Sequence, residues 1–328
     1  MSYNKVWFVT KIYKVVGMYD KVKFWAMRTR ATPDVSSFLD NAKCQIDLET
    51  GEGCTFGSLG GLKVSIYTGG ISIIGSLAKY LYPNNIYPLD RGSTAQAIEK
   101  LSDSLHLPIE GARVTGLEFG RAFVMRHPVK SYLNRLGDMP NLLRYHFSAD
   151  TLYYKPRGRQ QAKVFAFYDK KADAAAKGMV LPVGFEEINL LKYEMRLNGR
   201  LPQQMGVPEV TATTLTDGDF YRLLMKRYQN SYFAISKLNQ VNTNAMNDIK
   251  TVTEAYDVLV SRLINQSDQT QITAFLEDLK AANVFKDRKN YTRLKRKIKE
   301  VAAMGGVVEA DELIKELDDE INNVGAYV

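Results

Sequence analysis

Tyr168 stands among charged side chains that could bring its phenol to a phosphate group. It ends the run K-V-F-A-F-Y, and Lys170 and Lys171 follow it after a single aspartate. A tyrosine is a poor nucleophile at neutral pH because the pKa of its phenol is about 10. Neighbouring cations or a metal favour the phenolate and neutralise an attacked phosphate. The pattern predicts a nucleophilic tyrosine supported by two lysines; the open alternative is that Tyr168, one of 19 tyrosines, ends a buried strand.

Two glutamates interrupt apolar runs that otherwise read as strands. Glu118 lies within V-T-G-L-E-F-G, and Glu194 lies within L-L-K-Y-E-M-R-L. A carboxylate in such a run must be exposed, paired or bound to a cation. On adjacent strands the two would suit Mg²⁺ or Mn²⁺, which take hard oxygen ligands. The equally open alternative is pairing with Arg121, Arg196 or Lys192.

Basic residues gather at a turn and in a C-terminal helix. The turn is marked by Pro156 and Gly158, and residues 286–300 carry eight basic and two acidic side chains. The net charge of +8 and the pI near 9.2 indicate a polyanionic partner, with nucleic acid first. The helix could instead be solvated and balanced by the acidic segment 309–320. The candidate DNA contacts are Lys155, Arg157, Arg159, Lys192, Arg196, Arg293, Lys295 and Arg296.

The elements that must position these residues are strands with period-two alternation. The runs 151–154 and 163–168 flank the basic turn as a β-hairpin. Further strands are expected at 21–27, 62–67, 190–197 and from residue 114 onward. Helices are expected near Ser76, over 93–105 with Ser93 or Thr94 as N-cap, and over 129–136 before Gly137. These elements predict an α+β fold, with an antiparallel β-sheet core and flanking helices.

After about residue 240 the chain becomes helical and strongly charged. We therefore expect a catalytic domain over 1–240 and a helical C-terminal domain over 241–328, used for DNA binding or oligomerisation. Cys44 and Cys54 form no zinc-ligand set and are expected to be reduced thiols. No segment reaches the roughly 18–20 apolar residues of a membrane span, and the N-terminus lacks a signal-peptide pattern. The protein is expected to act where it is made.

With these residues in place, the chain resembles the replication initiators of filamentous phages, the phage/plasmid replication protein II/X family of the rolling-circle type. The resemblance covers roughly residues 20–235, in the family's order and at similar spacing. It departs from the family in two ways: Gly116-Leu117-Glu118 stands where Arg-x-Asp is often found, and the paired-histidine motif of related nickases is absent. The stretches that carry it are 75–85, 114–123, 151–171 and 190–197.

The resemblance implies a function. Such proteins nick one strand of a supercoiled origin, become linked to the 5′ phosphate through a tyrosine, and later rejoin the displaced strand. It places the nucleophile on Tyr168, the Mg²⁺ or Mn²⁺ ligands on Glu118 and Glu194, and phosphate support on Lys170 or Lys171. The implied partners are double- and single-stranded origin DNA, host polymerase and helicase, with no membrane, and the chain could form a homo-oligomer. The implied compartment is the bacterial cytoplasm.

Other functions stay open on the sequence. A non-catalytic origin-binding protein or repressor would use the basic hairpin and the C-terminal helices without cutting DNA. A tyrosine recombinase fits poorly, because its Arg/Lys/His/Arg set before a C-terminal tyrosine is not found. An RNA-binding structural protein would show no preference for one DNA sequence.

Overall fold

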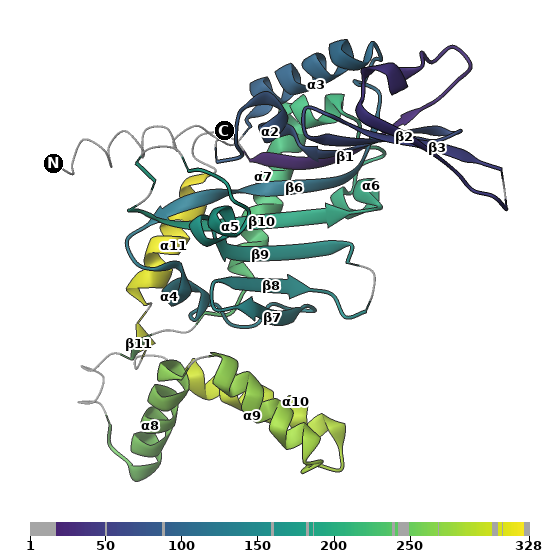
Figure 1. The fold of residues 1–328 in the computed structure, drawn as a ribbon. Helices are drawn as coiled ribbons and strands as arrows, with labels where there is room; N and C mark the ends of the chain where they lie inside the picture. The colour runs from purple at the N-terminus through teal and green to yellow at the C-terminus, as the bar shows by residue number, and fades with distance from the viewer. Residues whose placement is uncertain are drawn as a thin grey trace.

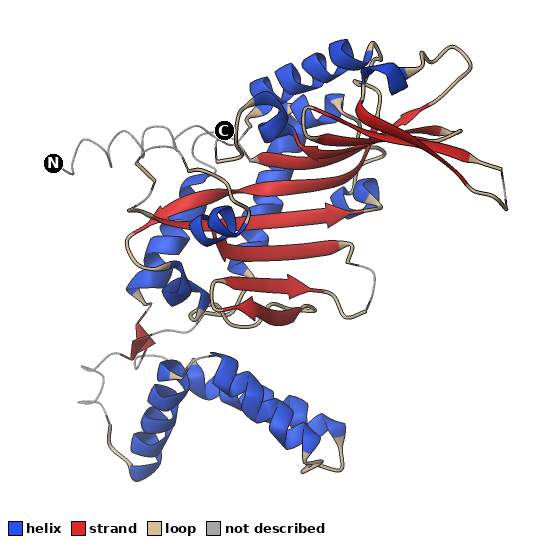
Figure 2. Cartoon of the chain, viewed as in Figure 1, coloured by secondary structure: helices blue, strands red, loops and turns tan. Residues whose placement is uncertain are grey.

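A ten-stranded antiparallel sheet forms the body of the described chain (Figure 2). The computed structural model describes residues 18–49, 51–86, 89–158, 161–181, 184–185, 187–237, 240–241, 249–267, 269–303, 308–309 and 311–324. The strand order is β2-β3-β4-β5-β1-β6-β10-β9-β8-β7, and the predicted α+β class with an antiparallel core is confirmed.

The strands are β1 (Tyr19–Met27), β2 (Asp40–Ile46), β3 (Gly53–Leu59), β4 (Leu62–Ile66), β5 (Gly70–Ser76), β6 (Arg113–Met125), β7 (Leu143–Ser148), β8 (Thr151–Lys155), β9 (Lys163–Asp169), β10 (Asn189–Asn198), β11 (Gln240–Val241) and β12 (Val308–Glu309). The helices are η1 (Val35–Phe38), α2 (Leu77–Leu81), α3 (Arg91–Leu105), α4 (Val129–Leu133), α5 (Lys170–Ala176), α6 (Leu201–Met205), η2 (Thr213–Thr216), α7 (Gly218–Phe233), α8 (Val252–Gln266), α9 (Gln269–Ala281), α10 (Arg288–Ala302) and α11 (Glu312–Asn323).

The predicted hairpin and the strand after it are present as β8, β9 and β10. Tyr168 pairs with Thr151 on one side and with Lys192 on the other, while Arg196 pairs with Glu118. Residues directly opposite each other in antiparallel strands share a face, and so do residues two apart. Tyr168, Lys192, Glu194, Arg196 and Glu118 therefore occupy one face of the sheet, which we call the polar face.

The opposite face of the sheet carries the aromatic core. Tyr193, between Lys192 and Glu194, stacks on Phe167 with ring centroids 4.2 Å apart and an interplanar angle of 8°. The ring centroid of Tyr228, in α7, also lies 4.2 Å from that of Tyr193. Helices α7 and α11 cover this face, whereas α5 lies on the polar face (Figure 1). Alternation along β10 thus separates a buried aromatic layer from the charged side chains.

A bulge in β1 brings two charged residues together. Tyr19 pairs with Phe119 and Val22 with Leu117, so β1 has one residue more than β6 in this interval. Asp20 and Lys21 both lie opposite Glu118 as a result. A bulge of this kind re-aims side chains that regular alternation would send to opposite faces.

The helix ends differ in two places from the sequence expectations. The N-cap of α3 is Asp90 rather than Ser93 or Thr94. The Asp90 side chain accepts from the backbone N–H of Ser93, and the Ser93 hydroxyl accepts from the backbone N–H of Asp90, which together form a capping box. The helix α4 ends at Leu133, with Asn134 as C-cap, before reaching residue 136. The start predicted near Ser76 is confirmed, since Ser76 caps α2 through the N–H of Lys79.

Helices α8, α9 and α10 form an insertion between two elements of the main core. The short strands β11 and β12 pair at its base, where the chain leaves and returns. The helix α11 then packs on α4, α7 and β6, and places Ile314, Leu317 and Ile321 in the same core as the sheet. The boundary predicted near residue 240 coincides with the start of the insertion, but α11 lies with the sheet rather than with α8–α10.

Within the described ranges, no helix has the length and apolar character required to cross a membrane. Cys44 and Cys54 lie on the paired strands β2 and β3 as free thiols.

Candidate functional site: a tyrosine–glutamate pair among cations

Tyr168 and Glu194 form a direct hydrogen bond on the polar face. The Tyr168 hydroxyl donates to Glu194 Oε1 over 2.7 Å. Tyr168 is 8 % exposed and Glu194 is 3 % exposed. Because β9 and β10 are adjacent, the pairing of Tyr168 with Lys192 brings the phenol to Glu194 two residues further along. Tyr168 thus meets one of the two predicted glutamates, and it is also buried near the end of β9, as the alternative interpretation expects. Its role as a nucleophile stays a prediction.

Two cations flank the Glu194 carboxylate. Arg196 donates to Oε2 through Nη2 at 2.8 Å and through Nε at 3.1 Å, and Lys192 Nζ lies 3.8 Å from Oε1. Burial raises the pKa of the Glu194 carboxyl, but Lys192, Arg196 and the hydrogen bond from Tyr168 outweigh it and hold that pKa below its ordinary value. Glu194 is therefore ionised at neutral pH.

The phenol of Tyr168 is correspondingly protonated. Burial first, and then the Glu194 carboxylate, raise the pKa of Tyr168 well above 10. Lys170, one of the two lysines expected to favour a free phenolate, is instead paired with the Asp173 carboxylate. A nucleophilic Tyr168 must therefore lose its proton to Glu194 during attack, rather than exist beforehand as a phenolate.

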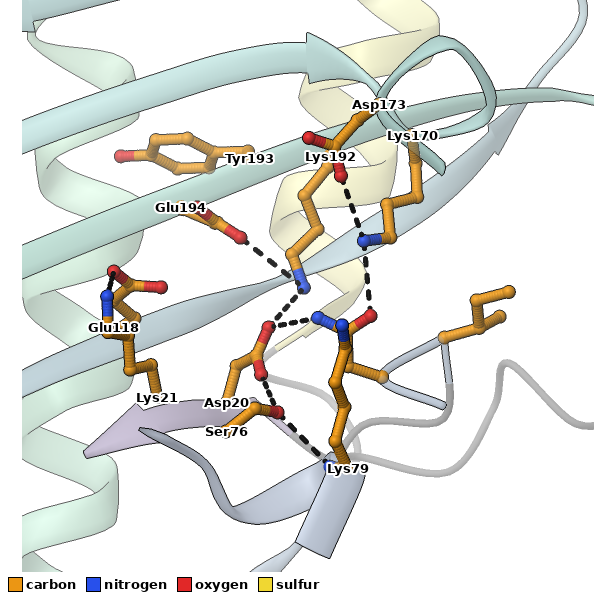
Figure 3. A network of polar contacts seen from close by, with 12 residues as sticks. Asp20, Lys21, Ser76, Lys79, Glu118, Lys170, Asp173, Lys192, Tyr193 and Glu194 are labelled. Atoms are coloured by element: carbon orange, nitrogen blue, oxygen red, sulfur yellow. Dashed lines mark hydrogen bonds and ion pairs between the residues drawn. The ribbon is translucent and has the colours of Figure 1, made fainter. Parts of the chain in front are cut away.

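Asp20 extends the network from Lys192 to Ser76 at the start of α2 (Figure 3). Its Oδ2 lies 3.9 Å from Lys192 Nζ and accepts from Asn85 Nδ2 over 2.9 Å. Its Oδ1 accepts from the hydroxyl of Ser76, the N-cap of α2. A buried carboxylate held by an amide, a hydroxyl and an ammonium is a positioned group that anchors Lys192.

Lys170 belongs to the same network, whereas Lys171 is only half-buried at the start of α5. Lys170 is 2 % exposed, and its Nζ donates to Asn85 Oδ1 over 3.2 Å and to Asp173 Oδ2 over 3.3 Å. Burial, with Lys192 nearby, lowers the pKa of Lys170. Figure 3 shows Lys170 and Lys192 converging on the Asp20 region from different elements.

Glu118 lies at the solvent-exposed end of the network. Its Oε1 is 3.6 Å from Lys21 Nζ and 4.0 Å from Arg196 Nε. Burial and the charge of Glu194 raise the pKa of the Glu118 carboxyl. The two glutamates thus share Arg196 but have opposite pKa shifts.

In this arrangement the predicted metal ligands are engaged by other side chains of the protein. Glu194 already accepts from a phenol on one oxygen and from a guanidinium on the other, and Arg196 also approaches Glu118. No group of three His, Cys, Asp or Glu side chains among the described residues could hold a metal ion. Mg²⁺ or Mn²⁺ binding by Glu118 and Glu194 stays a prediction, and no chemical step below depends on it.

Gly120 lets two strands approach closely behind the carboxylate. A Cβ added at Gly120 would lie 2.1 Å from the carbonyl oxygen of Tyr193 and 2.7 Å from the Cα of Glu194. No side chain larger than hydrogen fits there without separating β6 from β10. Gly120 therefore fixes the backbone position from which Glu194 meets Tyr168.

The polar face is covered at one end and open at the other. Ile86 and Phe185, from loops, pack on Leu190 and Ala122 over the end near the start of β10. Toward the opposite end, the Arg196 side chain is 29 % exposed, so the polar face is partly open to solvent there.

The predicted DNA contacts are spread over three places. Lys155 lies on β8 above the ring of Tyr145, and Arg196 and Lys192 lie in the network just described. Arg157 and Lys295 both line a cavity of about 880 Å³ between the sheet and the insertion. Arg159 lies outside the described residues.

The basic helix α10 pairs with the loop between α4 and β7 rather than with the acidic segment that follows it. Lys295 Nζ lies 2.8 Å from Asp138, and Arg296 pairs with Glu300 within α10 at 3.3 Å, while Arg293 is exposed. None of the ion pairs found in the described part of the chain joins α10 to α11. The DNA-contact role of all these cations stays a prediction.

Sequence reasoning missed Asp20, Asn85, Asp173 and Gly120. Asp20 reaches the polar face because of the bulge, and Asn85 lies in a loop, so neither has a spacing that signals it. The capping serine Ser76 was predicted for its helix but not for its bond to Asp20.

No model of a known protein family matches the chain, and the search of curated proteins found no match. The geometry of Tyr168, Glu194 and their cations is therefore the basis on which a function can be proposed.

Proposed function

We propose that this protein is a DNA nicking and joining enzyme in which Tyr168 attacks a phosphodiester while Glu194 accepts the phenol proton. The observation that carries the proposal is the 2.7 Å hydrogen bond from Tyr168 to an ionised Glu194 flanked by Lys192 and Arg196. A nucleophile, a base within hydrogen-bond distance and groups that orient the base are the elements of covalent catalysis.

The proposed step conserves charge within the network. The phenol oxygen forms a bond to phosphorus, the bond from phosphorus to the 3′ oxygen breaks, and the phenol proton passes to Glu194. Once protonated, Glu194 no longer neutralises Lys192 and Arg196, so their charge becomes available to the phosphate oxygens as negative charge develops there. The departing 3′ oxygen takes up a proton from solvent, so that the step releases a 3′ hydroxyl.

The product is a tyrosine–5′-phosphate ester, which keeps the energy of the broken bond. Attack by a 3′ hydroxyl on this ester reverses the step and rejoins a strand, so joining needs no nucleotide cofactor. This is the chemistry required of a rolling-circle replication initiator that nicks one strand of a double-stranded origin. We place its action in the bacterial cytoplasm on origin DNA, together with host polymerase and helicase.

The experiment is incubation of the full chain with supercoiled DNA of its own replicon, with Mg²⁺, with Mn²⁺ and with chelator. Open circles and a covalent DNA adduct mapped to Tyr168 by mass spectrometry are expected. Tyr168→Phe should abolish both, while Tyr67→Phe, a half-exposed tyrosine near Trp25, should change neither. Equal nicking by Tyr168→Phe would overturn the assignment.

A second candidate is a non-catalytic origin-binding protein or repressor. It is favoured by one observation: the buried charges are mutually paired and Tyr168 is 8 % exposed, as in a network whose role is structural. Such a protein would shift origin DNA in a gel without strand scission and without a metal requirement.

A further inference from the structure

We propose that the polar face, at the sheet edge formed by β7 and β8, binds single-stranded nucleic acid by stacking bases on three aromatic rings, those of Tyr145, Phe147 and Tyr153. We call this group the aromatic platform. Its role in guiding a strand to Tyr168 rests on the proposed function, whereas its binding of a strand can be measured without cleavage.

The rings are exposed where a sheet face usually is covered or polar. Phe147 is 69 % exposed and Tyr145 is 45 % exposed, and Tyr153 is half-buried beside them. Clustered exposed aromatic side chains lose the favourable free energy of burial, and such patches commonly mark binding sites. The exposure of these rings therefore calls for a partner with flat apolar faces.

The platform is continuous with the Tyr168 site. Tyr145 lies directly opposite Tyr153, which lies opposite Ala166, so the platform shares the polar face with Tyr168. The rings of Phe147 and Tyr153 meet edge to face with centroids 6.3 Å apart. A strand stacked on the rings would run across β7 and β8 toward Arg196.

Two cations lie beside the rings, so the expected partner carries negative charge. Lys155 Nζ lies 4.1 Å from the centroid of the Tyr145 ring. The Arg196 guanidinium lies 5.7 Å from the centroid of the Tyr153 ring while it also bonds Glu194. Aromatic rings interleaved with cations suit a polyanion that carries its own aromatic faces, and this combination describes single-stranded nucleic acid.

Duplex DNA does not fit the platform, because its bases stack on one another and their faces are not free. In a nicking reaction at an origin, the segment next to the cut becomes single-stranded. The platform would hold that segment so that its phosphate lies near Arg196 and Glu194. Base stacking on one aromatic ring corresponds to about 5- to 150-fold in affinity by alanine substitution.

The test is fluorescence anisotropy with labelled oligo(dT), oligo(U) and a duplex of mixed sequence, none of which carries the origin sequence that the proposed enzyme would cut. Tyr145→Ala and Phe147→Ala should each weaken oligo(dT) binding by about 5- to 150-fold and leave duplex binding unchanged. Phe56→Ala, which removes a comparably exposed ring from the distant strand β3, should weaken neither. Comparing oligo(dT) with oligo(U) identifies whether DNA or RNA is the preferred strand.

A second measurement protects the result against misfolded variants. Ultraviolet cross-linking of an iodouracil oligonucleotide to the unmodified chain should attach it to Tyr145, Phe147 or Tyr153. No binding of either oligonucleotide, unchanged binding by both variants, or cross-links that all map elsewhere would overturn the platform. Unchanged nicking by Tyr168→Phe, together with strand binding that Tyr145→Ala and Phe147→Ala weaken, would overturn the proposed nucleophile and leave the platform intact, so the two proposals fail separately.

Discussion

Replacing Glu194 with glutamine tests the charge balance of the site most directly. The substitution keeps the shape of the side chain but removes the negative charge that Arg196 meets at 2.8 Å and Lys192 at 3.8 Å. Removing one partner of a buried ion pair costs about 3–5 kcal/mol, because the other charge is left unpaired. Arg196 is partly exposed and keeps some hydration, so we expect the lower end, about 3 kcal/mol of the free energy of unfolding.

The assay is urea unfolding of the wild type and the variant at several pH values. A loss of about 3 kcal/mol moves the unfolding midpoint by about 1 M urea if the slope is about 3 kcal/mol/M. The pKa of Glu194 is lowered in the folded state, so its contribution is present above the unfolded pKa of about 4.3 and is lost as the pH falls through the folded pKa. The difference between the two proteins should therefore shrink in acid.

Glu118→Gln is the matched control, because the pKa of Glu118 is shifted in the opposite direction. Its raised pKa means that the neutral form is favoured in the folded state, so stability from this group is present in acid and is lost as the pH rises through the folded pKa. Glutamine imitates the neutral form, and we expect a change under about 1 kcal/mol at pH 7. Equal losses for the two variants, or a Glu194→Gln loss that does not diminish in acid, would refute the reasoning.

Three further predictions concern the elements around the site. Tyr168→Phe should lose nicking altogether but only about 1–2 kcal/mol of stability, since a single hydrogen bond is removed, and unfolding together with plasmid nicking checks both. Gly120→Ala should lower the free energy of unfolding by more than about 3 kcal/mol, because the added Cβ would lie 2.1 Å from the Tyr193 carbonyl oxygen. Gly111→Ala, with open space around it, is the control and should change stability little. Thermal unfolding of the two variants makes the comparison. Leu317→Ala should lower the free energy of unfolding by about 2–5 kcal/mol, because it leaves a cavity in the core. A loss near zero, as expected for an exposed leucine, would show that α11 does not share the core.

The sequence was sufficient for the strands that carry the site and for the face that the site occupies, whereas β2, β3 and β7 were not predicted. Alternation of period two placed Tyr168, Lys192, Glu194 and Arg196 on runs whose register then follows from antiparallel pairing. It did not give the partners of these residues, because the choice between a metal and Arg196 as the bridge between two carboxylates depends on rotamers and distances. Asp20 was not predictable, since one extra residue in β1 decides which face it occupies.

For the helices after residue 240, the sequence predicted the helices but not the elements on which they pack. Charge and amphipathic period identify α8, α9 and α10 as helices, but they carry no information about the element on which a helix packs. The acidic face of α11 suggested a partner for the basic α10, whereas its apolar face, with Ile314 and Leu317, packs on the sheet. Burial of that apolar face, rather than charge, determined its position.

The return of α11 to the core affects the order in which the chain can fold during its synthesis. Residues 18–237 leave the ribosome before the insertion, yet the aromatic layer around Tyr232 is completed only by Ile314 to Val324, which are made after it. The Tyr232 hydroxyl donates to Asp318 of α11 over 2.6 Å, so this contact also waits until α11 has been synthesised. The nascent sheet must therefore persist with part of its apolar surface uncovered while α8–α10 emerge, and a nascent chain stopped within the insertion would expose that surface to aggregation and to chaperones.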